Sequence, residues 1–202
     1  MDARPVLRQV ARALRLNEME AVLIGNTAAA LRGAPVTTVD VDFLFQKTLA
    51  NIAKLKILAR TLGATIFRPY YPVSSFYRVI REDDTLQLDF MIDAHGIRSF
   101  NSLKSRATHV DVGGEQLLVA ALSDIIASKR ATGRPRDHAV LETLEATLLQ
   151  AGKEADPPRN PRRASQGNEI ARIDLIRRLL AKPMSERTHF FRKRVGIAST
   201  CI

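Results

Sequence analysis

The chain has 202 residues, which is enough for one globular domain with a modest extension. Apolar residues make up 46% of the sequence, and charged or polar residues interrupt every apolar run before the roughly 18 residues of a membrane span. The single cysteine, Cys201, excludes an internal disulfide and a thiolate-rich metal site. The first residues lack the apolar core of a signal peptide, so we expect a cytoplasmic protein. A net charge of +10 favours a polyanionic partner such as nucleic acid or a nucleotide.

The positive charge is concentrated at the C-terminal end of the chain. Residues 153–202 hold twelve Lys or Arg and five Asp or Glu, a net charge of +7, whereas residues 1–152 carry only +3. Residues 153–167 combine prolines, arginines and small polar residues, the composition of an exposed connector. The sequence therefore predicts one domain over residues 1–152, a linker over 153–167 and a basic helical extension over 168–202.

Apolar periodicity predicts the following elements in chain order. Helices are expected over residues 5–16, 27–31, 48–62, 116–130 and 137–150, and strands over residues 21–24, 39–45, 64–67, 76–81 and 85–92. Asp83 and Asp84 form a turn between the last two strands, which we expect to pair in antiparallel orientation. Interleaved helices and strands with a hairpin predict an α/β (α+β) fold, with a mixed central sheet flanked by helices.

The expected strand over residues 39–45 contains two acidic residues that are separated by one position. Asp40 and Asp42 therefore point to one face, with Cα atoms about 6–7 Å apart, while Val41 and Phe43 point into the core. Two carboxylates held side by side repel each other, and the usual compensation is a hard divalent cation such as Mg²⁺. The alternative is that both are the solvated face of an amphipathic strand.

A third carboxylate, Asp89, lies in another expected strand, in which Leu86, Leu88 and Phe90 supply the buried face. Three acids on adjacent strands predict a site for two Mg²⁺ ions, which would position a nucleoside triphosphate and activate an attacking hydroxyl. Gly25 and Asn26 form a turn between a strand and a helix, where backbone N–H groups can approach a phosphate. The alternative for Gly25 is an ordinary turn glycine.

The segments LIGNTAAALRG, TTVDVDFLF and LDFM, in this order, resemble the nucleotidyltransferase fold of the DNA polymerase beta superfamily. The similarity is closer to the AbiEii-type and MenT-type bacterial nucleotidyltransferases, and it covers roughly residues 20–150. The resemblance implies that Asp40 and Asp42 are metal ligands and that Asp89 is the third acid and a general base. Asn26 stands where such proteins usually have glycine or serine, and implies a different side chain in the phosphate-binding turn.

The later segment ASKRATGRPRDHAVLE extends the resemblance, because such proteins contribute a lysine, an arginine and an aspartate here. It implies that Lys129 neutralises triphosphate charge and that Arg134 binds phosphate oxygens. Asp137 either acts in the site or caps a helix that begins at His138.

The hypothesis from the sequence is a Mg²⁺-dependent nucleotidyltransferase that transfers a nucleoside monophosphate from a nucleoside triphosphate to an acceptor hydroxyl. The basic tail favours an RNA acceptor, and the resemblance to MenT-type enzymes implies a toxin-like role, with an antitoxin or a homo-oligomer as partner. Three alternatives stay open: a small-molecule nucleotidyltransferase of the antibiotic-modifying type, a non-catalytic nucleotide- or RNA-binding module, and an interaction protein.

Overall fold

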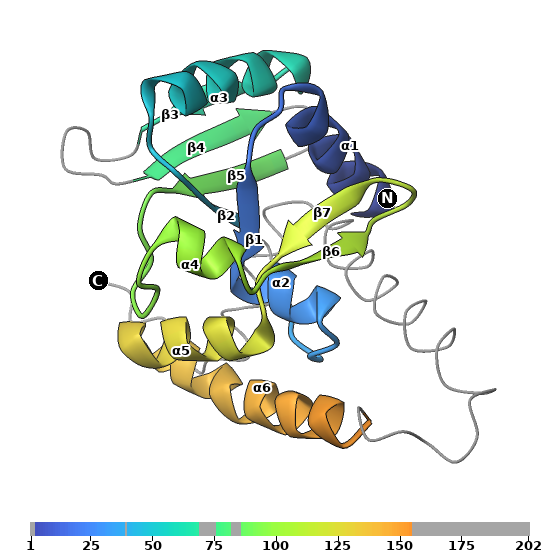
Figure 1. The fold of residues 1–202 in the computed structure, drawn as a ribbon, viewed down its shortest axis with the longest axis vertical. Coiled ribbons are helices and arrows are strands. Elements are labelled where there is room, and N and C mark those ends of the chain that lie inside the picture. The colour runs from blue at the N-terminus through green and yellow to red at the C-terminus, as the bar shows by residue number, and fades with distance from the viewer. Residues whose placement is uncertain (1–2, 39, 69–75, 82–85, 155–202) are drawn as a thin grey trace, which may run out of the picture.

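A computed structural model describes residues 3–38, 40–68, 76–81 and 86–154 of the chain. Within these residues a seven-stranded mixed sheet is flanked by helices (Figure 1). The helices are α1 (Ala3–Leu16), α2 (Gly25–Leu31), α3 (Leu49–Thr61), α4 (Phe100–Lys104), α5 (Leu122–Thr132) and α6 (Pro135–Glu154). The strands are β1 (Ala21–Ile24), β2 (Val41–Phe45), β3 (Thr65–Phe67), β4 (Phe76–Arg81), β5 (Leu86–Met91), β6 (Thr108–Asp111) and β7 (Gln116–Val119). The fold class predicted from the sequence is confirmed.

The strand order is β3-β4-β5-β2-β1-β7-β6, so segments far apart in the chain meet at the centre of the sheet. β2 pairs antiparallel with β1 on one side and parallel with β5 on the other. β5 in turn pairs antiparallel with β4, as the turn at residues 83–84 predicts. In Figure 1, α3 lies at one end of the molecule and α5 and α6 lie together at the opposite end.

Aromatic side chains hold β2, β5 and β4 together on the apolar face of the sheet. Phe43 of β2 stacks on Phe90 of β5 with ring centroids 5.0 Å apart, and Phe45 packs edge-on against Phe90 and against Tyr77 of β4. The three phenylalanines are fully buried. Because successive side chains of a strand point to opposite faces, this packing sets which residues of β2 and β5 face the other way.

One predicted helix is wrong in its first part. Residues 116–130 were expected to be helical, but Gln116–Val119 is strand β7, and the helix α5 begins only at Leu122. β7 forms a hairpin with β6, in which the Asp111 carboxylate accepts hydrogen bonds from the backbone N–H groups of Gly113 and Gly114, both at 3.1 Å. A short continuous apolar run such as QLLVAAL has the same pattern in a buried strand as in a helix, so its periodicity could not separate the two.

Several other elements differ from their predicted ranges at the ends. The helix predicted over residues 27–31 begins at Gly25, directly after β1, and the one predicted over 137–150 is α6, which begins at Pro135. The strand predicted over 39–45 begins at Val41, one residue after Asp40. The first two residues of the predicted linker, 153 and 154, are the end of α6, whereas the turn at residues 83–84, the rest of the linker and the basic extension lie outside the described residues. Among the described residues, no helix is long and apolar enough to cross a membrane.

Candidate functional site

Three adjacent strands carry charged side chains at directly opposed positions, and these side chains are here called the acidic row. The strand register places Asp42 of β2 opposite Asp89 of β5, and Asp89 opposite Arg78 of β4. Directly opposed residues of neighbouring strands share a face of the sheet, so the two carboxylates and the guanidinium lie side by side. The sequence prediction that Asp42 and Asp89 come together is consistent with this register.

Asp40 lies on the same face of the sheet, two residues before Asp42. Gln87, two residues before Asp89, donates a hydrogen bond from Nε2 to Asp40 Oδ1 at 3.4 Å. The backbone of Asp40 is held as well, because its carbonyl oxygen accepts from Thr27 Oγ1 of α2 at 2.7 Å and from Thr38 Oγ1 at 3.0 Å. Asp40 therefore has a defined position although it precedes β2.

Gly25 lies close to the Asp42 side chain. Its φ is +71°, in the left-handed region that favours glycine, and β1 passes into α2 at this residue without an intervening loop. A Cβ added at Gly25 would overlap Oδ2 of Asp42. The backbone conformation therefore favours glycine here, and an added Cβ would in addition force the end of the Asp42 side chain to move. This goes beyond the role of an ordinary turn glycine.

The two neighbouring carboxylates are unfavourably placed as anions. Burial raises the pKa of Asp42 to about 7, with further contributions from the negative charges of Asp40 and Asp89. Burial also raises the pKa of Asp40, and Asp89 acts in the same direction. The Arg136 side chain lowers both pKa values, although not enough to cancel the effect. A cation at this site would relieve the repulsion.

Asp89 differs from the other two acids because it has a cation of its own. Arg78 donates from Nε to Asp89 Oδ1 and from Nη2 to Oδ2, both at 2.7 Å, in the paired geometry that suits a guanidinium and a carboxylate. The guanidinium carbon of Arg78 also lies 5.4 Å from the centroid of the Phe76 ring. The hydrogen bonds to Asp89 raise the pKa of Arg78, so this charge is permanent.

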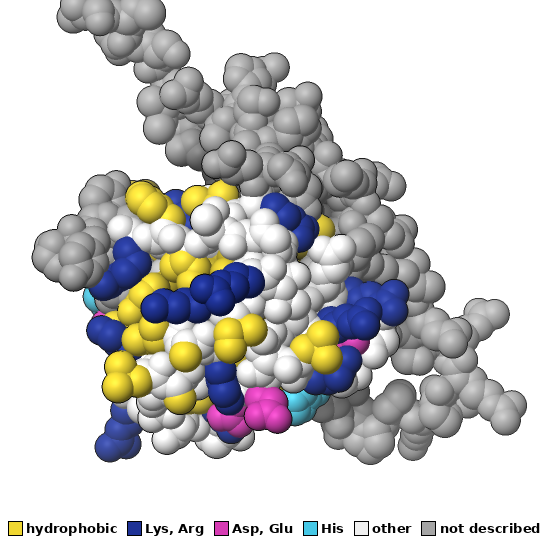
Figure 2. Space-filling view, turned by 90° about the horizontal axis from the view of Figure 1, so that it is seen from above, with side chains coloured by type: hydrophobic (Ala, Val, Ile, Leu, Met, Phe, Trp, Pro, Cys, Tyr) yellow, Lys and Arg dark blue, Asp and Glu magenta, His cyan; other side chains and the backbone are white. Residues whose placement is uncertain are grey.

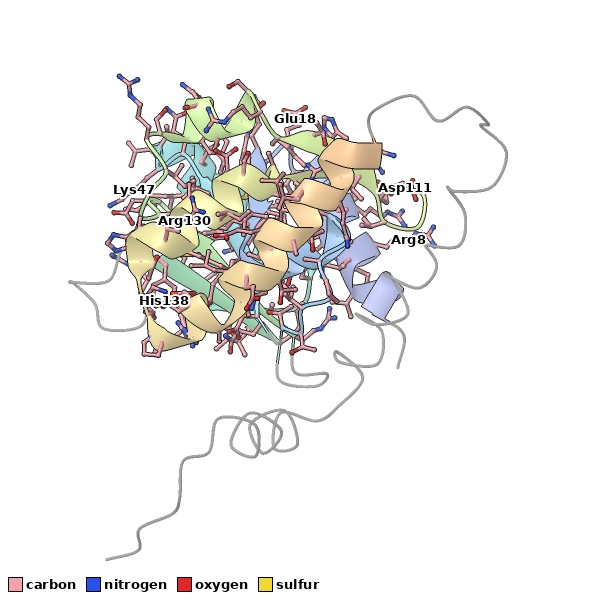
Figure 3. All side chains as sticks on the ribbon, turned by 90° about the horizontal axis from the view of Figure 1, so that it is seen from below. Arg8, Glu18, Lys47, Asp111, Arg130 and His138 are labelled. Atoms are coloured by element: carbon pink, nitrogen blue, oxygen red, sulfur yellow. The ribbon has the colours of Figure 1, made fainter. Side chains whose placement is uncertain are left out.

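The α5–α6 corner supplies further cations. α5 and α6 pack side by side, as the view from below shows, with Arg130 on α5 and His138 in the first part of α6 (Figure 3). Lys129 Nζ lies 3.3 Å from Asp137 Oδ1, and both side chains are largely buried. Lys129 and Arg136 are also the two cations that lower the pKa of Asp42. The α5–α6 corner therefore places positive charge near Asp40 and Asp42.

The first residue of α6 decides whether Asp137 caps this helix. The proposed cap of a helix beginning at His138 is wrong, because α6 begins at Pro135 and Asp137 lies inside its first turn. Proline suits the first position of a helix, which needs no N–H donor there. Asp137 instead pairs with Lys129, while its Oδ2 is buried without a hydrogen-bond partner among the described residues.

Asn26 and Arg134 stay predictions as phosphate-binding residues. Asn26 Nδ2 donates to the Thr37 carbonyl oxygen at 3.5 Å, and its Oδ1 is buried without a hydrogen-bond partner among the described residues. The side chain of Arg134 is exposed, and its carbonyl oxygen accepts the backbone N–H groups of Asp137 and His138. It is Arg136, rather than Arg134, whose charge acts on both Asp40 and Asp42.

Two carboxylates of the predicted three are suited to a metal ion. Among the described residues, no group of three His, Cys, Asp or Glu side chains is arranged to hold one. The third carboxylate, Asp89, is ion-paired with Arg78 through both of its oxygens, so its negative charge is already compensated. Asp40 and Asp42 still fit a hard divalent cation, since both are oxygen donors whose mutual repulsion a cation would relieve.

Sequence reasoning missed Arg78, Gln87 and Arg136. A signal for Arg78 was present, since a hairpin that turns at residues 83–84 pairs residue 82 with 85 and therefore Arg78 with Asp89. Gln87 follows from the alternation of the same strand, two residues before Asp89. Arg136 had no such signal, because both Arg134 and Arg136 flank Pro135 and only the turn between α5 and α6 decides which one faces the acids.

No family model and no curated protein sequence matches this chain, but its fold matches solved structures. The nucleotidyltransferase-like antigenic protein from Paracoccidioides brasiliensis matches with a TM-score of 0.51 and 13% identity, over 87% of each chain. ANT(2'')-Ia in complex with adenylyl-2''-tobramycin gives 0.51 and 14%, over 85% of this chain and 95% of that chain. The lincosamide antibiotic adenylyltransferase LnuA, bound to lincomycin, gives 0.51 and 13%, over 70% and 95%. The chain has the nucleotidyltransferase fold.

We expect Gly25→Ala to destabilise the protein more than Gly63→Ala does. Both glycines have a positive φ, +71° and +64°, so each alanine meets a backbone penalty of about 1–2 kcal/mol. Only at Gly25 does the added Cβ also meet the Asp42 carboxylate, whereas nothing lies within 4 Å of a Cβ at Gly63. Urea denaturation of the two variants would measure the difference in free energy of unfolding.

A double-mutant cycle then tests the cause. In an Asp42→Ala background the overlap at Gly25 is gone, so Gly25→Ala should cost no more than Gly63→Ala does. An equal cost of Gly25→Ala in both backgrounds would contradict the close approach.

We expect Asp42→Asn to stabilise the metal-free protein at pH 8. The folded pKa of Asp42 is about 7 against an ordinary value of 3.8, so the folded state binds more protons than the unfolded state between these two pH values. The contribution of Asp42 to stability is therefore full below about pH 4 and is lost as the pH rises through about 7. The variant should be more stable than the wild type by about 1–3 kcal/mol at pH 8, with little difference at pH 4.

Chemical denaturation in the presence of EDTA at several pH values measures this. Asp93→Asn, at an exposed aspartate, serves as the control and should change stability by less than about 0.5 kcal/mol at every pH. A wild type that is as stable as Asp42→Asn at pH 8 would show that the Asp42 carboxylate is not strained.

Proposed function

We propose that this protein is a nucleotidyltransferase that transfers a nucleoside monophosphate from a nucleoside triphosphate to an acceptor hydroxyl. The observation that carries the proposal is the carboxylate pair Asp40 and Asp42 on a nucleotidyltransferase fold, with Asp42 next to Gly25 and with cations of α5 and α6 close enough to act on the pair. Such a pair destabilises the empty protein, which indicates a ligand of opposite charge. The likeness in fold supports this class of reaction.

Asp40 and Asp42 would hold Mg²⁺. When bound, Mg²⁺ supplies a positive charge that stabilises the phosphoryl group under attack and favours ionisation of the acceptor hydroxyl. The chain prepares this binding by holding Asp40 through Gln87 and Thr27, and by fixing the backbone of Asp42 between the paired strands β1 and β5. Preorganised ligands need little rearrangement on binding.

The other charged groups would each have a separate role in the reaction. Arg136 and Lys129 lie on the side of α5 and α6, where they would bind the oxygens of the triphosphate and favour release of pyrophosphate. Asp89 would accept the proton of the acceptor hydroxyl while that oxygen bonds to the α-phosphorus and the bond to pyrophosphate breaks. Arg78 keeps Asp89 in the orientation needed for this step.

An RNA acceptor is favoured by the distribution of positive charge. Residues 46–62 contain four basic residues and no acidic one, and the face seen from above shows Lys and Arg side chains among hydrophobic ones (Figure 2). Lys47, Lys56 and Arg60 in this segment are exposed. Together with the net charge of +7 over residues 153–202, this surface would contact phosphates independently of sequence. A toxin-like role and an antitoxin partner are further predictions from the resemblance.

A small hydroxylated molecule is the second candidate acceptor. ANT(2'')-Ia was solved with an adenylylated tobramycin and LnuA with lincomycin, and both share the fold of this chain. Under this alternative the basic surface has no part in the reaction, so deletion of residues 153–202 would leave turnover unchanged. With an RNA acceptor the same deletion would weaken binding and flatten its salt dependence.

Transfer of a radiolabelled nucleotide tests the reaction. We expect label from at least one α-labelled nucleoside triphosphate to appear in total RNA or in a small hydroxylated acceptor, in the presence of Mg²⁺. Asp42→Ala should lower the rate by about 100-fold or more, the scale of losing one preorganised electrostatic group. Asp93→Ala removes an exposed aspartate and is the control. A wild type that labels no RNA, protein or small molecule would leave a non-catalytic nucleotide-binding protein and overturn the proposal.

Arg134 and Arg136 offer a matched pair for the binding step. Both are exposed arginines that flank Pro135, but only the charge of Arg136 acts on Asp40 and Asp42. We expect Arg136→Gln to weaken binding of a non-hydrolysable triphosphate with Mg²⁺ by about tenfold, and Arg134→Gln by less than about twofold. Isothermal titration calorimetry measures both affinities. The reverse order would make Arg134 the phosphate-binding residue, as the sequence predicts.

A further inference from the structure

Arg78 is the least expected member of the acidic row, because it neutralises the acid that the sequence assigns to a second metal ion. Its two hydrogen bonds use both oxygens of Asp89, at 2.7 Å each. The pair spans β4 and β5 at directly opposed positions, so the sheet itself holds the two groups together. The Asp89 side chain is 11% exposed and that of Arg78 29%, which leaves only a small area of the pair in contact with water.

The Arg78 guanidinium also acts on the other two acids. Its charge lowers the pKa of Asp40, and the charges of Asp40 and Asp42 are among the causes that raise the pKa of Arg78. The guanidinium therefore lies in the electrostatic field of all three carboxylates. Arg78 therefore supplies part of the positive charge that a second metal ion would otherwise supply.

The formal charges show how many ions the site needs. Asp40, Asp42 and Asp89 contribute three negative charges when ionised, and Arg78 contributes one positive charge, which leaves two negative charges. Lys129 is paired with Asp137 and so does not change this balance, whereas the exposed Arg136 brings one further positive charge near Asp40 and Asp42. One divalent cation at Asp40 and Asp42 is then sufficient, and a second would bring an excess of positive charge next to Arg78.

We propose that Arg78 is a built-in cation that replaces the second metal ion, so that the metal-free site takes up one divalent cation, at Asp40 and Asp42. The inference rests on the proposed function, because it concerns the ions of that same site. Arg78 is a positioning residue in this scheme. It holds Asp89 as an oriented carboxylate and keeps it from binding metal.

The experiment counts bound Mn²⁺, a spectroscopic substitute for Mg²⁺, on the full chain without nucleotide. Electron paramagnetic resonance of free Mn²⁺ during a titration gives both the number of sites and their affinity. We expect one Mn²⁺ per wild-type chain and two per Arg78→Gln chain, because the substitution frees Asp89 and leaves three negative charges. Arg81→Gln changes an arginine of the same strand that binds the Leu62 carbonyl oxygen instead, and it should keep one site.

A double variant separates the role of Asp89 from a general effect of charge. Arg78→Gln with Asp89→Asn exchanges an ion pair for a neutral pair, so the site keeps its two negative charges. We expect one Mn²⁺, bound within about threefold of the wild-type affinity. If Asp89 were a metal ligand in the wild type, this variant would lose affinity by tenfold or more, and the inference would be overturned.

The remaining outcomes are also decisive. Two equivalent sites in the wild type, or a single site in folded Arg78→Gln, would overturn the role of Arg78 and leave the proposed function standing. No Mn²⁺ bound to either the wild type or Arg78→Gln would instead contradict the metal centre of the proposed function. Far-ultraviolet circular dichroism and a thermal melt of each variant establish that it is folded, and the double variant provides the test if Arg78→Gln alone does not fold.

Discussion

The close approach of the Asp42 carboxylate to Gly25 is the constraint on which the rest of the site depends. It requires a residue without a Cβ at the junction of β1 and α2, and it presses a charged group into a place where burial raises its pKa to about 7. Asp40 and Asp89 add negative charge on both sides of it. The cations Arg78, Lys129 and Arg136 partly compensate for the repulsion between these carboxylates. A site of this kind is unfavourable for stability when empty and favourable for a cationic ligand.

The opposite face of the same strands makes this strain tolerable. Phe43 lies next to Asp42 in β2, and Phe90 lies next to Asp89 in β5, so the residues that alternate with the acids form a fully buried aromatic stack. Stacking of the two rings fixes β2 against β5 in register, and the register then fixes Asp42 opposite Asp89. A shift of one residue would place the carboxylates in the core. The polar site and the apolar core are thus two consequences of one strand pairing.

Alternation made much of the site predictable. The pattern of VDVDF and LQLDF indicates two strands with acids on one face, and a turn predicted at residues 83–84 implies the observed register of β4 and β5, in which Arg78 is opposite Asp89. Prediction failed where local pattern is ambiguous. QLLVAAL suits a strand or a helix equally, and its place in the sheet depends in part on pairing with β1, which is distant in sequence. Likewise, no local pattern distinguishes Arg134 from Arg136, because the difference arises from how α6 packs on α5.

The distribution of charge sharpens what the net value of +10 means. Around the acidic row, positive groups are matched to individual acids: Arg78 to Asp89 and Lys129 to Asp137. Such pairs are nearly neutral at a distance and act only at contact range, which suits the binding of one nucleotide. By sequence, most of the remaining excess of positive charge lies in residues 46–62 and 153–202. This excess is distant in sequence from Asp40, Asp42 and Asp89, so the net charge says more about the acceptor of the proposed reaction than about how the metal and the nucleotide would be held.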